Sequence, residues 1–204
     1  MIVIVDYGVG NLFSLQSSFA AISEQVVVSA DPAVISRAQR IVLPGVGAFA
    51  DAAQKLERSG LGALLVRLAG EGKKILGICL GMQLLFEQSR EFGTHKGLGL
   101  IPGSVEPIAP EVDASCKIPH IGWNSLSLHG DSPLFRDTKE GAYVYFVHSY
   151  YAKTDEKYIT ATTHYGVELT AAVQNKNVYG CQFHPEKSGE EGLKILRAFC
   201  AEEE

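Results

Sequence analysis

Short apolar runs alternate with stretches of helical spacing over the first half of the chain. Buried strands are predicted at four runs rich in β-branched residues, at positions 2–5, 26–28, 41–43 and 75–78. The segment after the first run carries apolar residues at the spacing of one helix face, Leu12, Leu15, Phe19 and Ile22. Helical material is also expected between the third run and Ala69. Strands that alternate with helices predict a parallel sheet with helices on both faces.

After Gly93 the pattern changes to short strand-like pieces that are punctuated by Pro and Gly. These pieces lie at residues 97–110, 118–128, 142–147, 158–162, 170–173 and 178–181. A last helix is expected near the C-terminus, where Ser188 and Glu191 match an S-x-x-E capping box and one face would carry Leu193, Leu196 and Cys200. The whole pattern predicts an α/β fold. We expect a three-layer sandwich around a mainly parallel sheet, with antiparallel strands in the second half, in a single domain over residues 1–204.

Composition and charge narrow the class of protein. The chain has 204 residues, of which 46% are hydrophobic and 20% charged, as is ordinary for a globular protein. Its net charge is −5 and no basic cluster is present, which argues against a nucleic-acid partner. The apolar runs are too short to span a bilayer, and Met1 leads directly into a strand without a signal peptide. We therefore expect a cytoplasmic chain with no membrane partner.

The cysteines and histidines do not suggest a metal centre. The four cysteines show no C-x-x-C pair, and the six histidines show no H-E-x-x-H motif. Disulfides are not expected in a reducing compartment. The sequence thus predicts neither a metal site nor a cofactor.

The stretch around Cys79 is the first candidate for chemistry. Gly77 and Gly81 flank Cys79 at two-residue spacing, between the strand at 75–78 and a helix-competent run at 82–86. A strand, a sharp glycine turn and a helix are the context of a nucleophile elbow. A helix N-terminus there would favour a thiolate. The alternative is a buried cysteine within a strand–helix unit, because free cysteine is often buried. The flanking glycines favour the nucleophile.

A second glycine loop follows the third strand. A proline followed by two glycines at a strand end, as at Pro44, usually indicates only a turn. Here a backbone N–H from this loop could face the Cys79 turn, where the N–H of Leu80 points. Two such donors would form an oxyanion hole. Both loops lie at carboxyl ends of strands, which is where ligands bind in parallel α/β sheets.

The loop before the last helix supplies a candidate base. A cysteine nucleophile needs a group that takes its proton and later gives it to the leaving amine. His184 fits this role, and Glu186 would orient its ring across the stiff Pro185. The alternative is a surface His and Glu in a loop that leads into a helix. Among the other histidines, His148 ends a predicted strand and could orient a substrate.

These motifs together resemble the triad glutamine amidotransferases. The resemblance rests on three strings that stand in that family's order across nearly the whole chain, GICLG at 77–81, HPE at 184–186 and PGVG at 44–47. Further strings are similar to the glutaminase subunits of imidazole glycerol phosphate synthases: IGWN at 121–124, YFVHSY at 145–150, HPEKS at 184–188 and the glycine loop at 6–12.

The resemblance implies a role for each residue of the candidate site. Cys79 would attack the side-chain amide of L-glutamine and form a glutamyl thioester, with His184 as base and then acid and Glu186 orienting it. The same resemblance assigns the oxyanion donors to Leu80 and the Val46–Gly47 segment. It implies that the amino-acid end of glutamine is held by three further residues, Gln83, Ser149 and Tyr150.

The resemblance also implies a partner. Water would release glutamate, and ammonia would pass to a separate synthase subunit of (β/α)8 fold, which makes imidazole glycerol phosphate in histidine biosynthesis. The two chains would form a heterodimer. Its docking face would include Asn11, Trp123, Asn124, Tyr145 and Lys187. The alternatives are a core aromatic for Trp123 and a solvated charge for Lys187.

Three functions remain open at this point. The first is the histidine-pathway glutaminase, and the second is a stand-alone cysteine hydrolase or a glutaminase that serves another synthase. The third is a non-catalytic binding module of similar fold. Because the chain ends at Glu204, soon after the last motif, we expect an acceptor-binding domain to be another protein. The glycines at 45–47 also predict a loop that misdirects its donor at rest, so that basal glutaminase activity is low until the partner and its nucleotide ligand bind.

Overall fold

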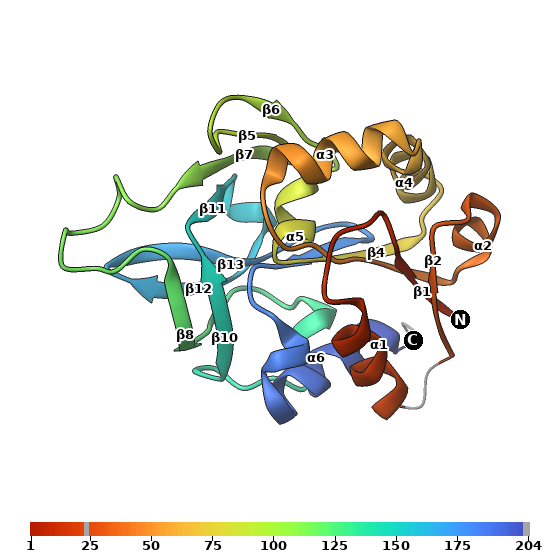
Figure 1. Cartoon of the computed structure of the whole chain (residues 1–204). Helices are drawn as coiled ribbons and strands as arrows, with labels where there is room; N and C mark the ends of the chain where they lie inside the picture. The colour runs from red at the N-terminus through yellow and green to blue at the C-terminus, as the bar shows by residue number, and fades with distance from the viewer. Residues whose placement is uncertain (23–24, 202–204) are drawn as a thin grey trace.

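An eight-stranded sheet runs through the middle of the computed structural model, which describes residues 1–22 and 25–201 (Figure 1). Its spatial order is β2-β1-β3-β4-β14-β13-β12-β9. In that order the strands cover Val26–Ser29, Ile2–Val5, Arg40–Leu43, Lys74–Ile78, Val178–Cys181, Val167–Asn175, Ile159–Tyr165 and Ser127–Leu128. The strands from β2 to β14 pair in parallel, and those from β14 to β9 pair antiparallel. The predicted α/β fold with antiparallel strands in the second half is confirmed.

Two smaller sheets flank the antiparallel end. One is a pair of antiparallel strands, β8 (His120–Ser125) and β10 (Tyr143–His148). The other has the order β11-β7-β5-β6, with strands at Tyr150–Lys153, Ile101–Pro107, Phe86–Ser89 and His95–Lys96. The predicted run at 118–128 is therefore divided between β8 and β9, because the chain turns between two sheets there.

Helices cover both faces of the large sheet and give the predicted three layers. In Figure 1, α3 (Phe49–Arg58), α4 (Leu61–Gly70) and the short α5 (Leu80–Leu84) lie above it, and α1 (Leu12–Ala21) and α6 (Gly189–Cys200) lie below. The remaining helix, α2 (Pro32–Arg37), lies near β1 and α4. Three 3₁₀ turns complete the order, η1 (Pro133–Phe135), η2 (Glu156–Tyr158) and η3 (Pro185–Lys187).

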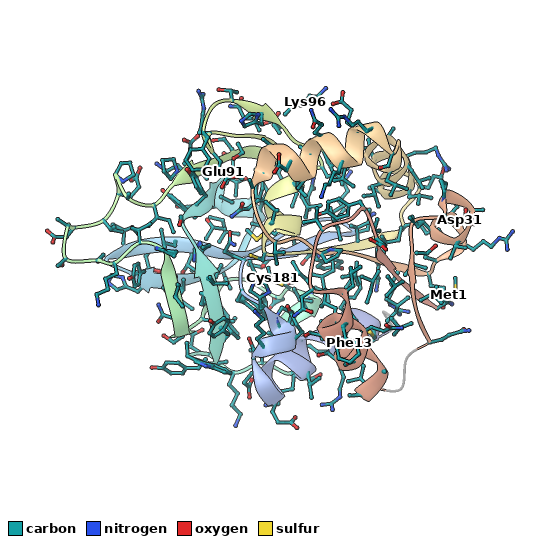
Figure 2. The ribbon with its side chains drawn as sticks, viewed as in Figure 1. Met1, Phe13, Asp31, Glu91, Lys96 and Cys181 are labelled. Atoms are coloured by element: carbon teal, nitrogen blue, oxygen red, sulfur yellow. The ribbon has the colours of Figure 1, made fainter. Side chains whose placement is uncertain are left out.

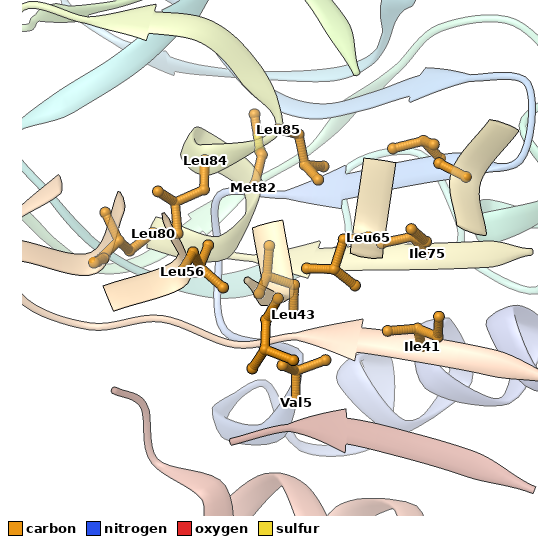
Figure 3. Close-up of a cluster of buried hydrophobic side chains, with 14 of the residues drawn as sticks. Val5, Ile41, Leu43, Leu56, Leu65, Ile75, Leu80, Met82, Leu84 and Leu85 are labelled. Atoms are coloured by element: carbon orange, nitrogen blue, oxygen red, sulfur yellow. The ribbon is translucent and has the colours of Figure 1, made fainter. Parts of the chain in front are cut away.

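Alternate residues of each parallel strand contribute to two separate cores. Val5, Ile41, Leu43 and Ile75 face α3 and α4 and pack with Leu56 and Leu65 (Figure 3). Their sequence neighbours Ile2, Ile4, Val42 and Leu76 face the other side and pack with Leu15, Phe19 and Phe199 of α1 and α6. This double burial explains why the strands are continuous apolar runs rather than alternating ones.

Sequence analysis missed α2, although its start carries two ordinary signals. Asp31 caps the helix by accepting a hydrogen bond from the backbone N–H of Ala33 at 2.8 Å, and Pro32 occupies the first position. Both residues are typical of a helix N-terminus. The helix has only six residues, which is too short to produce a clear apolar period.

Two local predictions about helices are wrong. The helix expected at 82–86 begins earlier, at Leu80, and ends at Leu84. It ends there because Phe86 belongs to β5, where it pairs with Ile101 of β7. The capping box of Ser188 does not form either. The Ser188 hydroxyl instead accepts a hydrogen bond from the N–H of Tyr145 at 3.0 Å and donates to the carbonyl of His184 at 2.7 Å.

The buried face of α6 also differs from the prediction. Leu196 and Cys200 are buried as expected, but Leu193 is only half-buried. The buried face is completed by Gly192, Ile195, Ala198 and Phe199. The single-domain prediction covers residues 1–204. Of these, residues 23–24 and 202–204 lie outside the described part of the chain. Within the described part, no helix has the length and apolarity that a bilayer crossing requires.

Candidate active site

Cys79 occupies a sharp turn between β4 and α5. Its backbone has φ 54° and ψ −112°, a conformation that residues with a side chain rarely adopt. The flanking glycines make this turn possible. A Cβ atom on Gly81 would lie 1.9 Å from the carbonyl oxygen of Leu43, and one on Gly77 would lie 2.6 Å from the carbonyl oxygen of Gly81. The strained backbone at a strand end is what a nucleophile elbow requires.

The sulfur of Cys79 lies among polar groups, although the residue is only 8% exposed. The side-chain amide of Gln182 donates to Sγ across 3.7 Å, and the carbonyl oxygen of Val147 lies 4.0 Å from it. The side chains of His184 and Cys79 interact, and this interaction contributes to the raised pKa of His184. Cys79 also belongs to the apolar cluster on this side of the sheet, but the polar contacts to its sulfur favour the nucleophile over a purely structural cysteine.

His184 and Glu186 form a buried pair. Nδ1 of His184 donates to Oε1 of Glu186 at 2.8 Å, and the side chains are only 4% and 2% exposed. The alternative of a surface His and Glu is therefore wrong. Burial alone lowers the pKa of His184, but hydrogen bonds to Cys79 and Glu186 outweigh it and raise the pKa to about 9. Since Nδ1 is engaged by Glu186, Nε2 is the ring nitrogen left for the thiol.

Main-chain contacts hold the loop of the pair against β10. The N–H of His184 donates to the carbonyl of Tyr145 at 2.9 Å, and Ser188 binds both residues through its hydroxyl. These two bonds hold the Ser188 hydroxyl on Tyr145 and His184, and it makes no capping hydrogen bond to α6. Cys181 lies at the end of β14 and is labelled in the middle of Figure 2. Burial raises its pKa well above the ordinary value, so it stays a neutral thiol.

The Pro44 loop lies directly beside the elbow. A Cβ on Gly45 would lie 2.8 Å from the backbone nitrogen of Gly81, so only glycine permits this approach. The hydroxyl of Tyr7 donates to the carbonyl of Pro44 at 2.7 Å and anchors the loop. Val46 and Gly47 are exposed beyond it, and Gly47 has a positive φ of 94°. The loop therefore lies beside the elbow, and the role of Val46 and Gly47 as oxyanion donors stays a prediction.

Gln83 lies one helical turn beyond the elbow and is almost wholly buried. Its Nε2 donates to Oε1 of Gln182 at 3.0 Å and to the carbonyl of Tyr150 at 3.2 Å. The backbone of the next predicted substrate residue, Ser149, accepts from Ile108 at 2.9 Å. The structure brings Gln83 and the backbone of Tyr150 together, and their binding of a substrate stays a prediction.

No sequence pattern pointed to Glu91, which contacts the start of α3 just after the Pro44 loop. Its carboxylate accepts a hydrogen bond from the N–H of Phe49, the first residue of α3. Its charge also contributes to raising the pKa of Tyr150, after burial. Figure 2 places Glu91 above the sheet, at the end of the helix that follows the Pro44 loop. No local motif marks it, since it follows β5 in an ordinary polar turn.

The expectation that His148 orients a substrate is wrong. Its Nδ1 donates to the carbonyl of Tyr150 at 2.8 Å, and its Nε2 faces Nδ1 of His120 at 2.9 Å. Both ring nitrogens are therefore occupied by the protein. Burial lowers the pKa of His148 to about 3 and that of His120 to about 4, so the pair is neutral near neutral pH.

The predicted docking residues separate into two groups. Trp123 is 54% exposed, so the core alternative is wrong for it, and its ring meets that of Tyr145 edge to face at 6.2 Å. Lys187 is exposed with its Nζ 5.6 Å from the Tyr145 ring. Asn124 follows Trp123 in β8 and points to the opposite side, where it donates to the carbonyl of His164 at 2.9 Å.

Further exposed residues lie near the predicted docking face. Ile121 and Tyr143 extend the exposed face of β8 and β10 beside Trp123, and neither was predicted to belong to the docking face. Asn11 is exposed and caps α1 by accepting from the N–H of Ser14 at 3.4 Å.

Within residues 1–22 and 25–201, no three His, Cys, Asp or Glu side chains gather as a metal site would require.

Comparisons with known proteins agree with this geometry. Residues 3–202 match the family model described as glutamine amidotransferase class-I. The chain is 48% identical to "Imidazole glycerol phosphate synthase subunit HisH" of Listeria monocytogenes over 199 residues, which cover 98% of the chain and 94% of the relative. It is 49% identical to the protein of the same name from Sulfurimonas denitrificans, with 98% and 97% covered.

Solved structures support the fold. "Crystal structure of glutamine amidotransferase" superposes with a TM-score of 0.76 at 15% identity and covers 98% of this chain and 100% of that one. "Structure of PurLQS from Thermotoga maritima" has a TM-score of 0.74 at 22% identity, with 98% and 96% covered.

Proposed function

The chain belongs to the class-I glutamine amidotransferases, and among them to the subunits of imidazole glycerol phosphate synthase; from this premise we propose that Cys79, His184 and Glu186 are its catalytic triad. One observation carries the assignment. The thiol, the imidazole and the carboxylate lie together at the carboxyl ends of β4 and β14, with the imidazole hydrogen-bonded to the carboxylate and interacting with the thiol. The substrate is L-glutamine, which the triad hydrolyses to glutamate and ammonia.

The reaction begins with attack of the Cys79 sulfur on the side-chain carbonyl carbon of glutamine. Because the pKa of His184 is raised to about 9, the thiol proton resides on His184 before the attack, and Glu186 stabilises this imidazolium. The oxygen of the tetrahedral intermediate accepts hydrogen bonds from the N–H of Leu80 and from the Val46–Gly47 segment. His184 then returns the proton to the leaving nitrogen, so that ammonia departs and a glutamyl thioester remains.

Water completes the cycle. His184 takes a proton from a water molecule, whose oxygen attacks the thioester carbon, and the C–S bond breaks to release glutamate. The proton returns to the sulfur. Gln83 and the backbone of Ser149 and Tyr150 hold the amino-acid end of glutamine, which is supported by their position around the elbow.

The ammonia passes to a second chain. We assign the partner as the synthase subunit of (β/α)8 fold, which uses ammonia to make imidazole glycerol phosphate in the cytoplasm, and the two chains form a heterodimer. Trp123, Tyr145 and Lys187 form the centre of the docking face, because they stand together on an exposed surface. Asn11 lies at its edge, and Asn124 supports it from the inner side of β8.

Glutamate release tests this function. The unaltered chain should hydrolyse glutamine slowly alone and much faster with the synthase subunit and its nucleotide ligand. Cys79→Ala should abolish hydrolysis in both conditions, a loss of at least about 10⁴-fold, and still bind the partner. Hydrolysis that survives in Cys79→Ala would overturn the triad. Full activity of the isolated chain would contradict the partner dependence and favour a stand-alone hydrolase.

A further inference from the structure

Gln182 is the one polar side chain besides His184 for which the described structure gives a donor contact to the Cys79 sulfur. It directly follows β14 and is 0% exposed. Its backbone N–H donates to the carbonyl of Ala171 at 2.8 Å, which holds it in place. Its side-chain Nε2 lies 3.7 Å from Sγ, a normal distance for a hydrogen bond to sulfur. The proposed mechanism gives this residue no part.

The direction of the Gln182 amide is determined by its neighbours. Gln83 donates from Nε2 to Oε1 of Gln182, so the oxygen faces Gln83 and the NH₂ group faces the sulfur. Gln83 is itself oriented, because its NH₂ group also donates to the carbonyl of Tyr150, which can only accept. A reversed Gln182 would oppose two NH₂ groups in a buried place, which is unfavourable.

The carbonyl of Tyr150 is anchored by the histidine pair. His148 donates to it from Nδ1, and His120 donates to Nε2 of His148. Since burial lowers the pKa of both rings, His148 keeps a single proton on Nδ1 near neutral pH. Every member of the network therefore has a defined donor and acceptor, and none can rotate without leaving a buried polar group unpaired.

The chemistry of the two contacts to sulfur is opposite. The carbonyl of Val147 can only accept, so it favours the protonated thiol, while an amide N–H can only donate, so it favours the thiolate. Sulfur is a weak acceptor as a thiol and a strong one as an anion. The contact with Gln182 therefore strengthens when the Cys79 proton moves to His184.

We propose that Gln182 is a positioning residue that holds the Cys79 sulfur and stabilises its thiolate through a side-chain amide oriented by Gln83, Tyr150 and the His120–His148 pair. The inference rests on the proposed function, because it gives Gln182 a role in the same nucleophile. A buried glutamine that only stabilises the fold is the competing explanation. The two differ in whether the ionisation of Cys79 depends on Gln182.

Alkylation by iodoacetamide measures that ionisation without glutamine or a partner. The full chain is treated over a range of pH, and modification is counted on the Cys79 peptide by mass spectrometry, because Cys116 is also a free cysteine and half-exposed. Gln182→Met removes the donor and should move the midpoint of the rate upward by about one pH unit. Gln182→Glu keeps an acceptor for Gln83 and places a carboxylate against the sulfur, so its midpoint should move further.

Gln174→Met is the matched control. Gln174 also makes two side-chain hydrogen bonds, with Ser132 and with the carbonyl of Lys176, but far from the elbow, so its alkylation profile should equal that of the unaltered chain. In glutamine hydrolysis with the synthase subunit, Gln182→Glu should lower kcat about ten-fold and change KM less. Folded Gln182 variants with unaltered alkylation midpoints would overturn the proposal and leave a structural role.

The unaltered protein decides the matter if both Gln182 variants fail to fold. In NMR spectra of the full chain, the side-chain amide protons of Gln182 should shift with the same midpoint as Cys79 alkylation. Amide protons that do not respond would also overturn the proposal. Alkylation needs no turnover. If the Gln182 variants shift the alkylation midpoint but the unaltered chain shows no glutaminase activity even with the synthase subunit and its nucleotide ligand, the proposed function fails and the role of Gln182 at the sulfur stands.

Discussion

Nδ1 of His184 lies 2.8 Å from Oε1 of Glu186, and both side chains are almost completely removed from water. The second carboxylate oxygen, Oε2 of Glu186, is buried without a hydrogen-bond partner. Because Oε2 has no hydrogen-bond partner, the negative charge of Glu186 stabilises mainly the imidazolium form of His184. Pro185 joins the two residues within a single 3₁₀ turn and limits how far they can separate.

Glu186→Gln should slow glutamine hydrolysis without unfolding the protein. The amide keeps the size of the side chain but removes the charge that stabilises the His184 imidazolium. We expect kcat to fall on the order of 10- to 100-fold, with a small change in KM. Steady-state kinetics in the presence of the synthase subunit measures this. Unchanged kcat would show that the carboxylate does not assist the base.

The same pair predicts how stability depends on pH. Interactions with Cys79 and Glu186 raise the pKa of His184 to about 9, so the folded protein binds more protons than the unfolded chain between about pH 6.5 and 9. The free energy of unfolding contributed by the pair is therefore complete below about pH 6.5 and lost as the pH rises through about 9. Urea unfolding of the unaltered chain and Glu186→Gln should differ most at the lower end. A difference that grew with pH would contradict the assignment.

The buried histidines predict the opposite trend on the acid side. The pKa of His148 is lowered to about 3 and that of His120 to about 4, so the unfolded chain binds the extra protons below about pH 6.5. Stability from these groups is present above that pH and declines as the pH falls towards 3. For His148 the slope approaches about 1.4 kcal/mol per pH unit. His148→Gln should lower the stability at pH 7 and flatten the decline between pH 6 and 4.

Two glycines near the nucleophile should respond very differently to alanine. Gly81→Ala places a Cβ 1.9 Å from the carbonyl oxygen of Leu43, which requires a main-chain shift in the sheet and should cost about 3 kcal/mol or more. Gly47→Ala meets nothing within 4 Å and pays only for its positive φ, about 1–2 kcal/mol. Thermal unfolding of the two variants tests the order. Equal losses would mean that the close contact of Gly81 can relax.

Lys187→Ala should weaken assembly and leave the nucleophile intact. Lys187 lies over the ring of Tyr145 on the face that we assign to the partner, and its loss should weaken binding about three- to ten-fold. Calorimetric titration with the synthase subunit measures this, and iodoacetamide reactivity of Cys79 should not change. Lys96→Ala is the control, because Lys96 lies on the β5–β6 hairpin at the opposite side of the molecule (Figure 2). Equal affinities for both variants would exclude the assigned face.

Much of the nucleophile and its loop could be predicted because the causes are local. The turn at Cys79 needs Gly77 and Gly81, since any side chain there would collide with main-chain atoms only a few residues or one strand away. His184 and Glu186 are only two residues apart, so a short sequence motif was enough to predict their contact. The parallel strands could be predicted from continuous apolar runs because each strand is buried on both faces.

Local signals failed where a polar side chain had competing partners. Ser188 and Glu191 match a capping box, but the Ser188 hydroxyl is committed to Tyr145 and His184, whose positions depend on the packing of β10. Phe86 ends a helical pattern, but it pairs with Ile101 in a sheet that forms only when distant strands meet.

The sequence by itself determined the strand–helix alternation, the glycine elbow and the candidate triad, because each follows from steric limits or spacing within a few residues. Only the tertiary structure decided which polar groups surround the sulfur. Gln83 meets Gln182 across 99 positions, and His120 meets His148 across 28. The Gln83–Gln182 contact exists because β14 inserts between β4 and β13, and the His120–His148 contact exists because β8 pairs with β10. No local pattern records either pairing of distant strands.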